Sequence, residues 1–331
     1  MKVIIPLAGF GTRLRPHTFT KPKPLINVAG KPVLGHLLDK IAGLDIDEYI
    51  FIVGYLGDQV EDYVNREYKL NARFVEQKEM LGQAHAISLA QEYLNDGPVF
   101  ILFVDTLFEA DLSILGRTDE DAVIFVKEVE DPRPFGVVTL NANDYITGFI
   151  EKSTQMDNRL AVVGLYYFKN GNQLISAIQE LMDRKIMTKN EYFLADAMDI
   201  MVKRGLKFRT APVSVWLDAG KPETVLETNR YLLEHGRDNS AEVTGQTNLI
   251  IVPPVNIHPS AQITNSIIGP HVTIAARCVI TSSILRDTIV DEGSTCKDTL
   301  LEQSLIGRNA HVEDQYRSVN VGDSSAVGFA G

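Results

Sequence analysis

The feature that most constrains the fold is a six-residue repeat of apolar residues in the last quarter of the chain. Such a hexad repeat is typical of a parallel β-helix, in which three short strands form each coil and one residue per hexad faces inward. An antiparallel sandwich would need turn signals at intervals of about 8–12 residues. Residues 250–331 contain no Asn-Gly or Asp-Gly pair, so we favour the β-helix. The repeating positions are Ile268, Ile274 and Ile280, then Ile284, Val290 and Cys296, then Leu300, Ile306 and Val312.

A longer repeat lies in the same segment, because residues 283–294 resemble residues 299–310 at an offset of 16. The two cysteines, Cys278 and Cys296, are separated by three hexads, which make one full triangular coil. We therefore expect them to stack in the core. Two cysteines form no disulfide framework and no four-ligand zinc site. The predicted apolar interior consists of Ile263, Ile268, Ile274, Ile284, Val290 and Ile306.

Residues 1–235 follow a different pattern, in which strand-like and helix-like segments alternate. This alternation predicts an α/β fold with a Rossmann-like, mixed and mostly parallel sheet and helices on both faces. A polar linker at 235–240 separates the two patterns, so we place one domain at 1–238 and the β-helix domain at 239–331. The predicted strands are Val3–Leu7, Tyr49–Val53, Ala72–Val75, Val99–Val104, Asp121–Val126, Gly136–Leu140, Ala161–Phe168 and Phe208–Val213. The predicted helices are Val33–Leu44, Asp58–Tyr68, Gln83–Leu94, Gln173–Asp183, Leu194–Arg204 and Lys221–Glu234.

Charge and hydropathy argue against two classes of partner. The net charge of −11 disfavours nucleic acid as a partner. No apolar run reaches the roughly 18 residues of a membrane helix, and no cleavage site follows the apolar start. We therefore expect a cytoplasmic protein. The charge is uneven, because residues 1–40 carry seven Lys or Arg residues and one Asp. A basic segment in an acidic chain indicates a local anion site.

A glycine-containing loop follows the first predicted strand and opens the basic segment. Gly9 and Gly11 let the backbone turn tightly, so that successive N–H groups can form an anion-binding concavity. The loop is not the dinucleotide fingerprint, because a leucine holds the third glycine position. It is not a Walker A loop either, because no Gly-Lys-Ser/Thr follows. Arg13 and Lys23 could supply the cations that cleavage of a triphosphate requires.

The stretch from Gly9 to Pro32 resembles the signature of the sugar-1-phosphate nucleotidyltransferases. The matching parts are Gly9-x-Gly11-Thr12-Arg13-Leu14-x-Pro16-x-Thr18, Lys23-Pro24-Leu25 and Gly30-Lys31-Pro32. Within the family, the stretch is most similar to glucose-1-phosphate thymidylyltransferases and uridylyltransferases. The resemblance implies that Arg13 and Lys23 are catalytic and stabilise the transition state. It also implies nucleotide-binding roles for Leu7, Ala8, Gly9, Gly11 and Thr12.

Further motifs extend the resemblance over about residues 1–235, so that 1–238 would be the catalytic domain. The stretch Glu79-Met80-Leu81-Gly82-Gln83-Ala84 resembles the loop that reads the base. It implies that Gly82 and Gln83 bind the nucleotide, and the Gln83 amide offers both a donor and an acceptor to a pyrimidine. Phe103-Val104-Asp105-Thr106 and Trp216-Leu217-Asp218-Ala219-Gly220 resemble two metal motifs. Asp105 and Asp218 would then hold one Mg²⁺, which is the expected cofactor.

The sugar-phosphate site of the family resembles Phe135-Gly136-Val137-Val138 and Ile150-Glu151-Lys152. The resemblance implies that Gly136, Glu151 and Lys152 bind the sugar phosphate. Three positions depart from the family pattern, namely Val104 for Gly, Ser153 for Pro, and Arg159 within a changed Ser-Asn-x-Ala motif, and the last of these departures leaves the sugar open. The tail is similar to the left-handed β-helices appended to several such enzymes.

The implied reaction joins a nucleoside triphosphate, with dTTP or UTP favoured, to a sugar 1-phosphate, with glucose 1-phosphate expected. The products would be a nucleotide sugar and pyrophosphate. Three alternatives stay open: a non-catalytic regulatory paralogue that binds a nucleotide sugar, guanylyl or adenylyl transfer, and acyl transfer by the β-helix. Histidines that could serve acyl transfer are His258, His271 and His311. The tail is expected to support a homo-oligomer through a self-complementary face.

Overall fold

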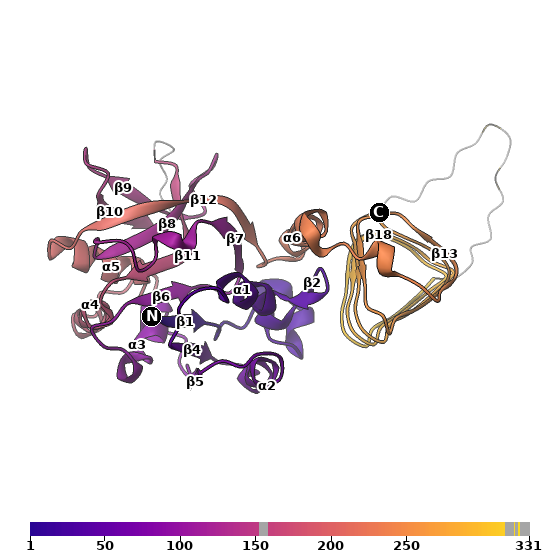
Figure 1. The fold of residues 1–331 in the computed structure, drawn as a ribbon, viewed down its shortest axis with the longest axis horizontal. Helices are drawn as coiled ribbons and strands as arrows, with labels where there is room; N and C mark the ends of the chain where they lie inside the picture. The colour runs from indigo at the N-terminus through magenta and orange to yellow at the C-terminus, as the bar shows by residue number, and fades with distance from the viewer. Residues whose placement is uncertain (152–157, 315–320, 322–323, 325–331) are drawn as a thin grey trace. The chain divides into compact units, whose positions relative to one another are not determined.

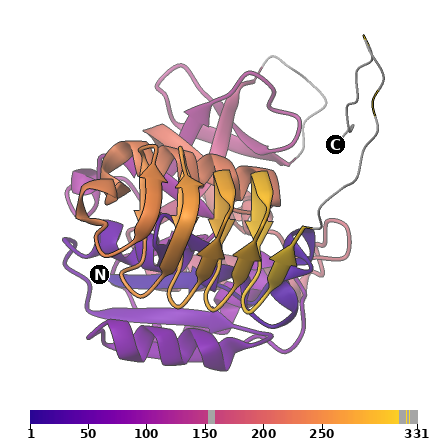
Figure 2. The same cartoon turned by 90° about the vertical axis from the view of Figure 1, so that its right-hand side faces the viewer.

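The computed structural model describes residues 1–151, 158–314, 321 and 324, and of Glu151 it describes only the backbone. The chain divides into two compact units, Met1–Thr228 and Asn229–Gly331, which Figures 1 and 2 show from two sides. The predicted α/β fold, a mixed sheet with helices on both faces followed by a parallel β-helix, is confirmed. None of the described helices is long and apolar enough to span a membrane.

The first unit is built on a ten-stranded mixed sheet. Strands β5, β4, β1 and β6 lie side by side and run parallel. Strand β11 then pairs antiparallel with β6 and β8, β12 runs parallel to β8, and β7 pairs antiparallel with β12. The hairpin β9–β10 joins the sheet through β11. The bounds are β1 Lys2–Pro6, β4 Glu48–Val53, β5 Ala72–Glu76, β6 Val99–Leu102, β7 Thr106–Ala110, β8 Ala122–Glu128, β9 Gly136–Leu140, β10 Ile146–Glu151, β11 Leu160–Phe168 and β12 Phe208–Asp218.

Two apolar cores cover the two faces of this sheet. The alternation of β1 separates them, because Ile4 packs into one core while Val3 and Ile5 pack into the other. Helices α3, α4 and α5 cover the Ile4 face, and α1 and α2 cover the opposite face. Full burial of each such side chain contributes about 1.5–3 kcal/mol. The helices are α1 Val33–Ile41, α2 Gly57–Glu67, α3 Gln83–Ser88, α4 Gly171–Asp183 and α5 Leu194–Lys203.

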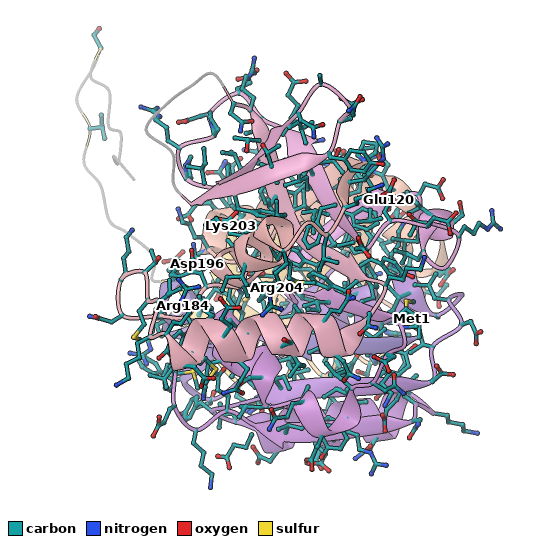
Figure 3. The ribbon with its side chains drawn as sticks, turned by 90° about the vertical axis from the view of Figure 1, so that its left-hand side faces the viewer. Met1, Glu120, Arg184, Asp196, Lys203 and Arg204 are labelled. Atoms are coloured by element: carbon teal, nitrogen blue, oxygen red, sulfur yellow. The ribbon has the colours of Figure 1, made fainter. Side chains whose placement is uncertain are left out.

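The outer surface of the α4 and α5 layer carries a small ion-pair network. Arg184 and Arg204, labelled in Figure 3, both bind the carboxylate of Glu180 at 2.6 Å. The two arginines are exposed and Glu180 is half-buried, so these ion pairs tie the ends of the two helices together with little gain in stability.

Several element bounds differ from the sequence prediction. The predicted helix at 83–94 ends at Ser88 and continues as a short 3₁₀ turn at Gln91–Tyr93. The predicted strand at 208–213 continues to Asp218, and β7 and β10 were not predicted. The extension of β12 lies at the sheet edge and its side chains are half-buried or exposed. The sequence therefore shows no apolar run there that would have predicted a strand. It is supported by pairing with β7, which is a tertiary contact.

The second unit is a parallel β-helix whose strands stack coil upon coil, side by side in Figure 2. Partners in successive coils lie 17 positions apart at Ile263 and Ile280, and 16 positions apart at Ile284 and Leu300. The predicted offset of 16 between 283–294 and 299–310 is thereby confirmed. The strands are β13 Thr247–Ile251, β14 Val255–Ile257, β15 Gln262–Ile268, β16 Val272–Ile274, β17 Val279–Thr281, β18 Ile284–Val290, β19 Thr295–Lys297, β20 Leu300–Ile306 and β21 His311–Glu313.

Two details of the predicted interior are wrong. Cys278 and Cys296 are both buried, but Cys296 pairs with Ile280 rather than stacking on Cys278. The coils are shorter than three full hexads because some left-handed corner residues, such as Arg277, Ser282 and Asp287, follow one another after five positions rather than six.

Ile284 faces outward, and the neighbouring Leu285 fills the interior instead. The predicted interior positions Ile263, Ile268, Ile274 and Val290 are completely buried, while Ile306 is half-buried.

Helix α6, Pro222–Leu232, contains the boundary between the units, which falls between Thr228 and Asn229 rather than in the polar linker at 235–240. Its last turn belongs to the β-helix unit through specific polar contacts. The buried Asn229 side chain accepts a hydrogen bond from the Thr273 hydroxyl at 2.6 Å. The Arg230 guanidinium binds both carboxylate oxygens of Asp287, at 2.7 and 2.6 Å.

We expect Arg230→Ala to destabilise the β-helix unit by about 2 kcal/mol, because a nearly buried carboxylate loses its bidentate partner. Hydrogen exchange of the β16 and β18 amides measures this opening free energy locally. Arg277→Ala is the control, because its guanidinium pairs with Glu292 at the exposed surface. Equal losses in both variants would contradict the role assigned to Arg230.

Candidate active site

The loop after β1 is held close to the end of β4. The Leu7 amide donates to the Ile52 carbonyl at 2.7 Å, and both Leu7 and Ala8 are buried. A Cβ on Gly54 would lie 2.6 Å from the Ala8 carbonyl oxygen, so the two backbones meet at a glycine. Gly9 has no atom within 4 Å of where its Cβ would be, which leaves its backbone accessible. The loop therefore presents free backbone on one side while its other side is packed.

Gly11 brings this loop against the segment that carries Lys23. Its φ of +61° lies in the left-handed region, and a Cβ there would lie 3.0 Å from the Lys23 Cβ. The Thr18 hydroxyl donates to the Gly11 carbonyl at 2.8 Å. The glycine is thus required both by its conformation and by the close approach of neighbouring chain.

Lys23 lies directly against Asp105. Its Nζ is 2.7 Å from an Asp105 carboxylate oxygen, and the two side chains are 15% and 34% exposed. Asp105 follows β6, at the carboxyl end of a central parallel strand, where open α/β sheets bind their ligands. The ammonium and the carboxylate offset each other's charge and stay accessible to a ligand.

Strand pairing brings Asp218 beside Asp105, although the two are distant in sequence. Asp218 ends β12 opposite Thr106, which begins β7. The Ala219 amide donates to the Asp105 carbonyl at 2.9 Å, which locks the two segments together. The Thr106 hydroxyl donates to the Val163 carbonyl at 3.0 Å and anchors β7 to β11. Backbone hydrogen bonds therefore hold the two segments that carry these carboxylates next to each other.

Arg13 reaches the same junction from the glycine loop. A Cβ on Gly220 would lie 2.8 Å from an Asp218 carboxylate oxygen and 3.0 Å from an Arg13 guanidinium nitrogen. The Thr224 hydroxyl donates to Asp218 at 3.1 Å and fixes the orientation of this carboxylate. Two cations and two carboxylates therefore gather within one small region.

This region forms a wall between two adjoining cavities. The first has a volume of about 390 Å³ and the second about 620 Å³. Both are lined by Arg13, Gln83, Phe103 and Asp105. The sequence-predicted residues that line the first cavity are Leu7, Ala8, Gly9, Gly11, Thr12, Arg13, Lys23, Gly82, Gln83 and Asp105. Those that line the second are Arg13, Gln83, Asp105, Gly136 and Asp218.

The loop that the sequence analysis predicts to read the base is built around Gly82, and it brings in Gln77, which the sequence did not indicate. A Cβ on Gly82 would lie 2.6 Å from the Tyr192 carbonyl oxygen, and its φ is +104°. The buried Gln77 amide nitrogen lies 3.3 Å from the Gly82 carbonyl and 3.1 Å from His85 Nδ1. Burial lowers the pKa of His85, so its neutral ring can accept this bond. Both Gln77 N–H groups are thus engaged, which leaves its oxygen as an acceptor beside the first cavity.

The second cavity is mostly apolar and carries one unpredicted cation. Phe135 and Trp216 lie with ring centroids 4.8 Å apart on its wall, and Lys221 lines it next to Asp218. The Asp199 carboxylate, on α5, accepts a hydrogen bond from the Phe149 amide at 3.0 Å, and this bond holds β10 against α5. Burial raises the pKa of Asp199. Lys221 could have been noticed from its position three residues after Asp218.

Five further residues, which the sequence either predicted for the site or showed to depart from the family pattern, have different outcomes. Glu151 ends β10, while Lys152 and Ser153 lie outside the described residues. Val104 is buried and lines the first cavity. Arg159 does not line either cavity, and its Nε donates to the Val129 carbonyl at 2.7 Å.

The Asp105 and Asp218 carboxylates fit a hard divalent cation, which prefers oxygen ligands. Across residues 1–151, 158–314, 321 and 324, no group of three or more His, Cys, Asp or Glu residues is arranged to hold a metal. A cation held by these two carboxylates would therefore complete its coordination with substrate and water oxygens.

Known proteins with similar sequence or fold identify the family of the chain. The sequence model of the nucleotidyl transferase family matches residues 2–235. Glucose-1-phosphate thymidylyltransferase from Streptomyces antibioticus is 30% identical over 99% of each chain. UTP–glucose-1-phosphate uridylyltransferase AglF from Haloferax volcanii is 29% identical over 71% of this chain and 97% of its own length.

A solved structure of UDP-glucose pyrophosphorylase complexed with UDP-glucose has the same fold over 71% of this chain and 98% of that chain. The TM-score is 0.62 at 22% identity. The family match covers the sheet unit except Met1, and every residue that lines the two cavities. The chain therefore belongs to the nucleotidyl transferase family, and it is an enzyme that transfers a nucleotidyl group.

Proposed function

We propose that the protein is a Mg²⁺-dependent glucose-1-phosphate thymidylyltransferase or uridylyltransferase. The observation that carries this proposal is the gathering of Arg13, Lys23, Asp105 and Asp218 where two cavities adjoin. A nucleotide and a sugar phosphate need adjoining sites that share the reacting phosphate region. The names of the relatives from Streptomyces antibioticus and Haloferax volcanii support the choice of sugar and base.

The first cavity takes the nucleoside triphosphate. The glycine loop with Gly9 and Gly11 offers backbone N–H groups to the phosphates. The free oxygen of Gln77 accepts from the N3–H of uracil or thymine, and the Gln83 amide adds a second contact to the base. Adenine and cytosine lack this ring N–H at neutral pH, so an acceptor oxygen at this position favours uracil or thymine over these two bases.

The second cavity takes the sugar 1-phosphate. Gly136 leaves room for the sugar ring, and Phe135 and Trp216 give it an apolar surface. Lys221 lines this cavity and can bind the phosphate from the side of Asp218. Glu151 and Lys152 complete the site in our proposal, with Glu151 on the sugar hydroxyls and Lys152 on the phosphate.

The reaction is an in-line displacement at the α-phosphorus, in which a sugar phosphate oxygen attacks and pyrophosphate leaves. The nucleophile is already anionic, so the chain needs no general base. Arg13 and Lys23 offset the charge that develops on the α-phosphate and pyrophosphate, and the cavity walls align the reactants. Asp105 and Asp218 hold the Mg²⁺, which supplies further charge neutralisation when bound.

Lys23→Ala should lower kcat by about 100-fold or more, because the variant loses a cation aimed at the transferring phosphate. Steady-state pyrophosphate release measures the effect. Lys40→Ala serves as control, because Lys40 pairs with Glu109 on the surface and lines neither cavity. A Lys23 variant as active as the control would remove Lys23 from the mechanism.

Asp105→Asn and Asp218→Asn should each abolish activity at ordinary Mg²⁺ concentrations, because an amide is a poor ligand for a hard cation. The double variant should lose far less than the product of the single losses, because both carboxylates serve one cation. Asp183→Asn, on the exposed end of α4, is the control. Multiplicative losses in the kinetic assay would show that the two carboxylates act independently.

A matrix of four nucleoside triphosphates against several sugar 1-phosphates, with pyrophosphate release as readout, tests the proposed function. We expect the highest kcat/KM with dTTP or UTP and glucose 1-phosphate. Gln83→Ala should reduce the ratio of kcat/KM with dTTP or UTP to kcat/KM with GTP. In the variant, a bound guanine leaves fewer polar groups of the protein unpaired, so it is rejected less strongly. Equal kcat/KM for all four bases in the wild type would overturn the base assignment.

A further inference from the structure

The hairpin β9–β10 has few strand contacts with the rest of the sheet, although it forms part of the second cavity. The register pairs one residue of the hairpin, Val137, with Ala161 of β11. Among the strands that the structure describes, β10 pairs with β9 alone, so its outer edge has no neighbouring strand. The position of β10 must therefore be fixed by contacts other than strand pairing.

The open end of this hairpin brings together two residues of the proposed sugar-phosphate site. Glu151, the last residue of β10, lies directly opposite Gly136, the first residue of β9. Phe149 and Ile150, which precede Glu151, line the second cavity together with Gly136. A displacement of β10 would therefore move both the wall of this cavity and the backbone that carries Glu151.

A side chain of α5 reaches the outer edge of β10. The Asp199 carboxylate accepts from the Phe149 amide at 3.0 Å, two positions before Glu151. A backbone N–H at the edge of a sheet has no strand carbonyl opposite it, so the carboxylate supplies the missing acceptor. Helix α5, beside the hairpin in Figure 1, also contributes Ala195 and Met198 to the second cavity. The bond therefore joins two walls of the same cavity.

The surroundings of Asp199 indicate that packing alone does not explain this residue. Its side chain is half-buried, and desolvation raises the pKa of its carboxyl against the opposing effects of the Phe149 amide and Lys203. A carboxylate that is partly removed from water costs free energy unless hydrogen bonds compensate it. An apolar side chain would cover the same surface without this cost. The acceptor that the carboxylate offers to β10 therefore accounts for its presence.

We propose that Asp199 is a positioning residue for the sugar 1-phosphate. Asp199 lines neither cavity, so it acts through β10, which it holds against α5 with Glu151 opposite Gly136. The described residues that line the first cavity include none from the hairpin, so binding of the nucleoside triphosphate does not depend on this bond. The assignment rests on the sugar-phosphate site of the proposed function.

Steady-state kinetics of Asp199→Ala test this role. We expect the KM for glucose 1-phosphate to rise by about tenfold, because its cavity wall loses a hydrogen bond to a charged acceptor. The KM for dTTP or UTP should stay unchanged. Asp199→Asn should return the KM for glucose 1-phosphate to within about threefold of the wild type, because the asparagine oxygen can accept the same bond.

The kinetic results that would overturn the proposal are equally specific. They are an unchanged KM for glucose 1-phosphate in the alanine variant, an equal rise in the KM for the nucleotide, and a failure of asparagine to restore binding. Asp121→Ala is the matched control, because the Asp121 carboxylate also accepts from a backbone amide, that of Lys207 at 2.7 Å, and lines neither cavity. Equal effects of the two alanine variants would show general loosening of the fold and contradict the role of Asp199.

Amide hydrogen exchange of the full chain, without substrates, measures the contact between α5 and β10 independently of the reaction. The Phe149 amide should exchange about tenfold faster or more in Asp199→Ala, while the amides of β4 keep their wild-type rates. A wild type that turns over no sugar 1-phosphate would overturn the proposed function, and the role of Asp199 in sugar binding with it. Unchanged exchange at Phe149 in the variant of an active enzyme would overturn the role of Asp199 alone.

Discussion

The pairing of the end of β12 with β7 is the interaction on which the active site depends. It brings Asp218 opposite Thr106, and the bond from the Ala219 amide to the Asp105 carbonyl closes the junction. Two carboxylates that are far apart in sequence become neighbours through backbone hydrogen bonds. Their spacing is therefore set by the sheet, and flexible side-chain contacts make only the final adjustment.

The same junction balances charge within an acidic protein. The chain has a net charge of −11, yet Arg13 and Lys23 approach the two aspartates from the basic N-terminal segment. Each cation has a carboxylate beside it, so neither charge is left isolated in a cavity wall. Glycines at positions 11 and 220 allow these charged side chains to lie so close together. A Cβ at position 11 would crowd the Lys23 Cβ, and a Cβ at position 220 would crowd the Asp218 carboxylate and the Arg13 guanidinium.

Much of this arrangement could be predicted from the sequence, because the chemistry of the site is concentrated in short local motifs. The glycine loop with Arg13 and Lys23 needs only its own few residues to present cations and backbone N–H groups. Gln77 was missed because it follows a half-buried strand with no motif around it, and only burial beside His85 gives it a role. Lys221 was missed although it lies only three residues after Asp218, because no motif includes it and its place beside the second cavity depends on the tertiary pairing that extends β12.

The β-helix illustrates a different limit of prediction from the sequence. A hexad repeat fixes the kind of structure, but counting by six assumes that every coil contains three full hexads. Corner residues that follow one another after five positions, such as Arg277, Ser282 and Asp287, shorten the coils, which places Ile284 outward and Leu285 inward. A shift of one residue along a strand reverses the face of each side chain, so the repeat alone did not show which residues face outward.

The central claim is that one constellation of two cations and two carboxylates serves both cavities as a single active site. Diffraction from crystals grown with Mn²⁺, in place of Mg²⁺, and a nucleoside-diphosphate glucose tests it most directly, because manganese is located by its anomalous signal. The account predicts one manganese peak in contact with both Asp105 and Asp218, and the diphosphate bound along the shared wall near Arg13 and Lys23. A manganese peak away from these carboxylates, or a diphosphate outside both cavities, would contradict it.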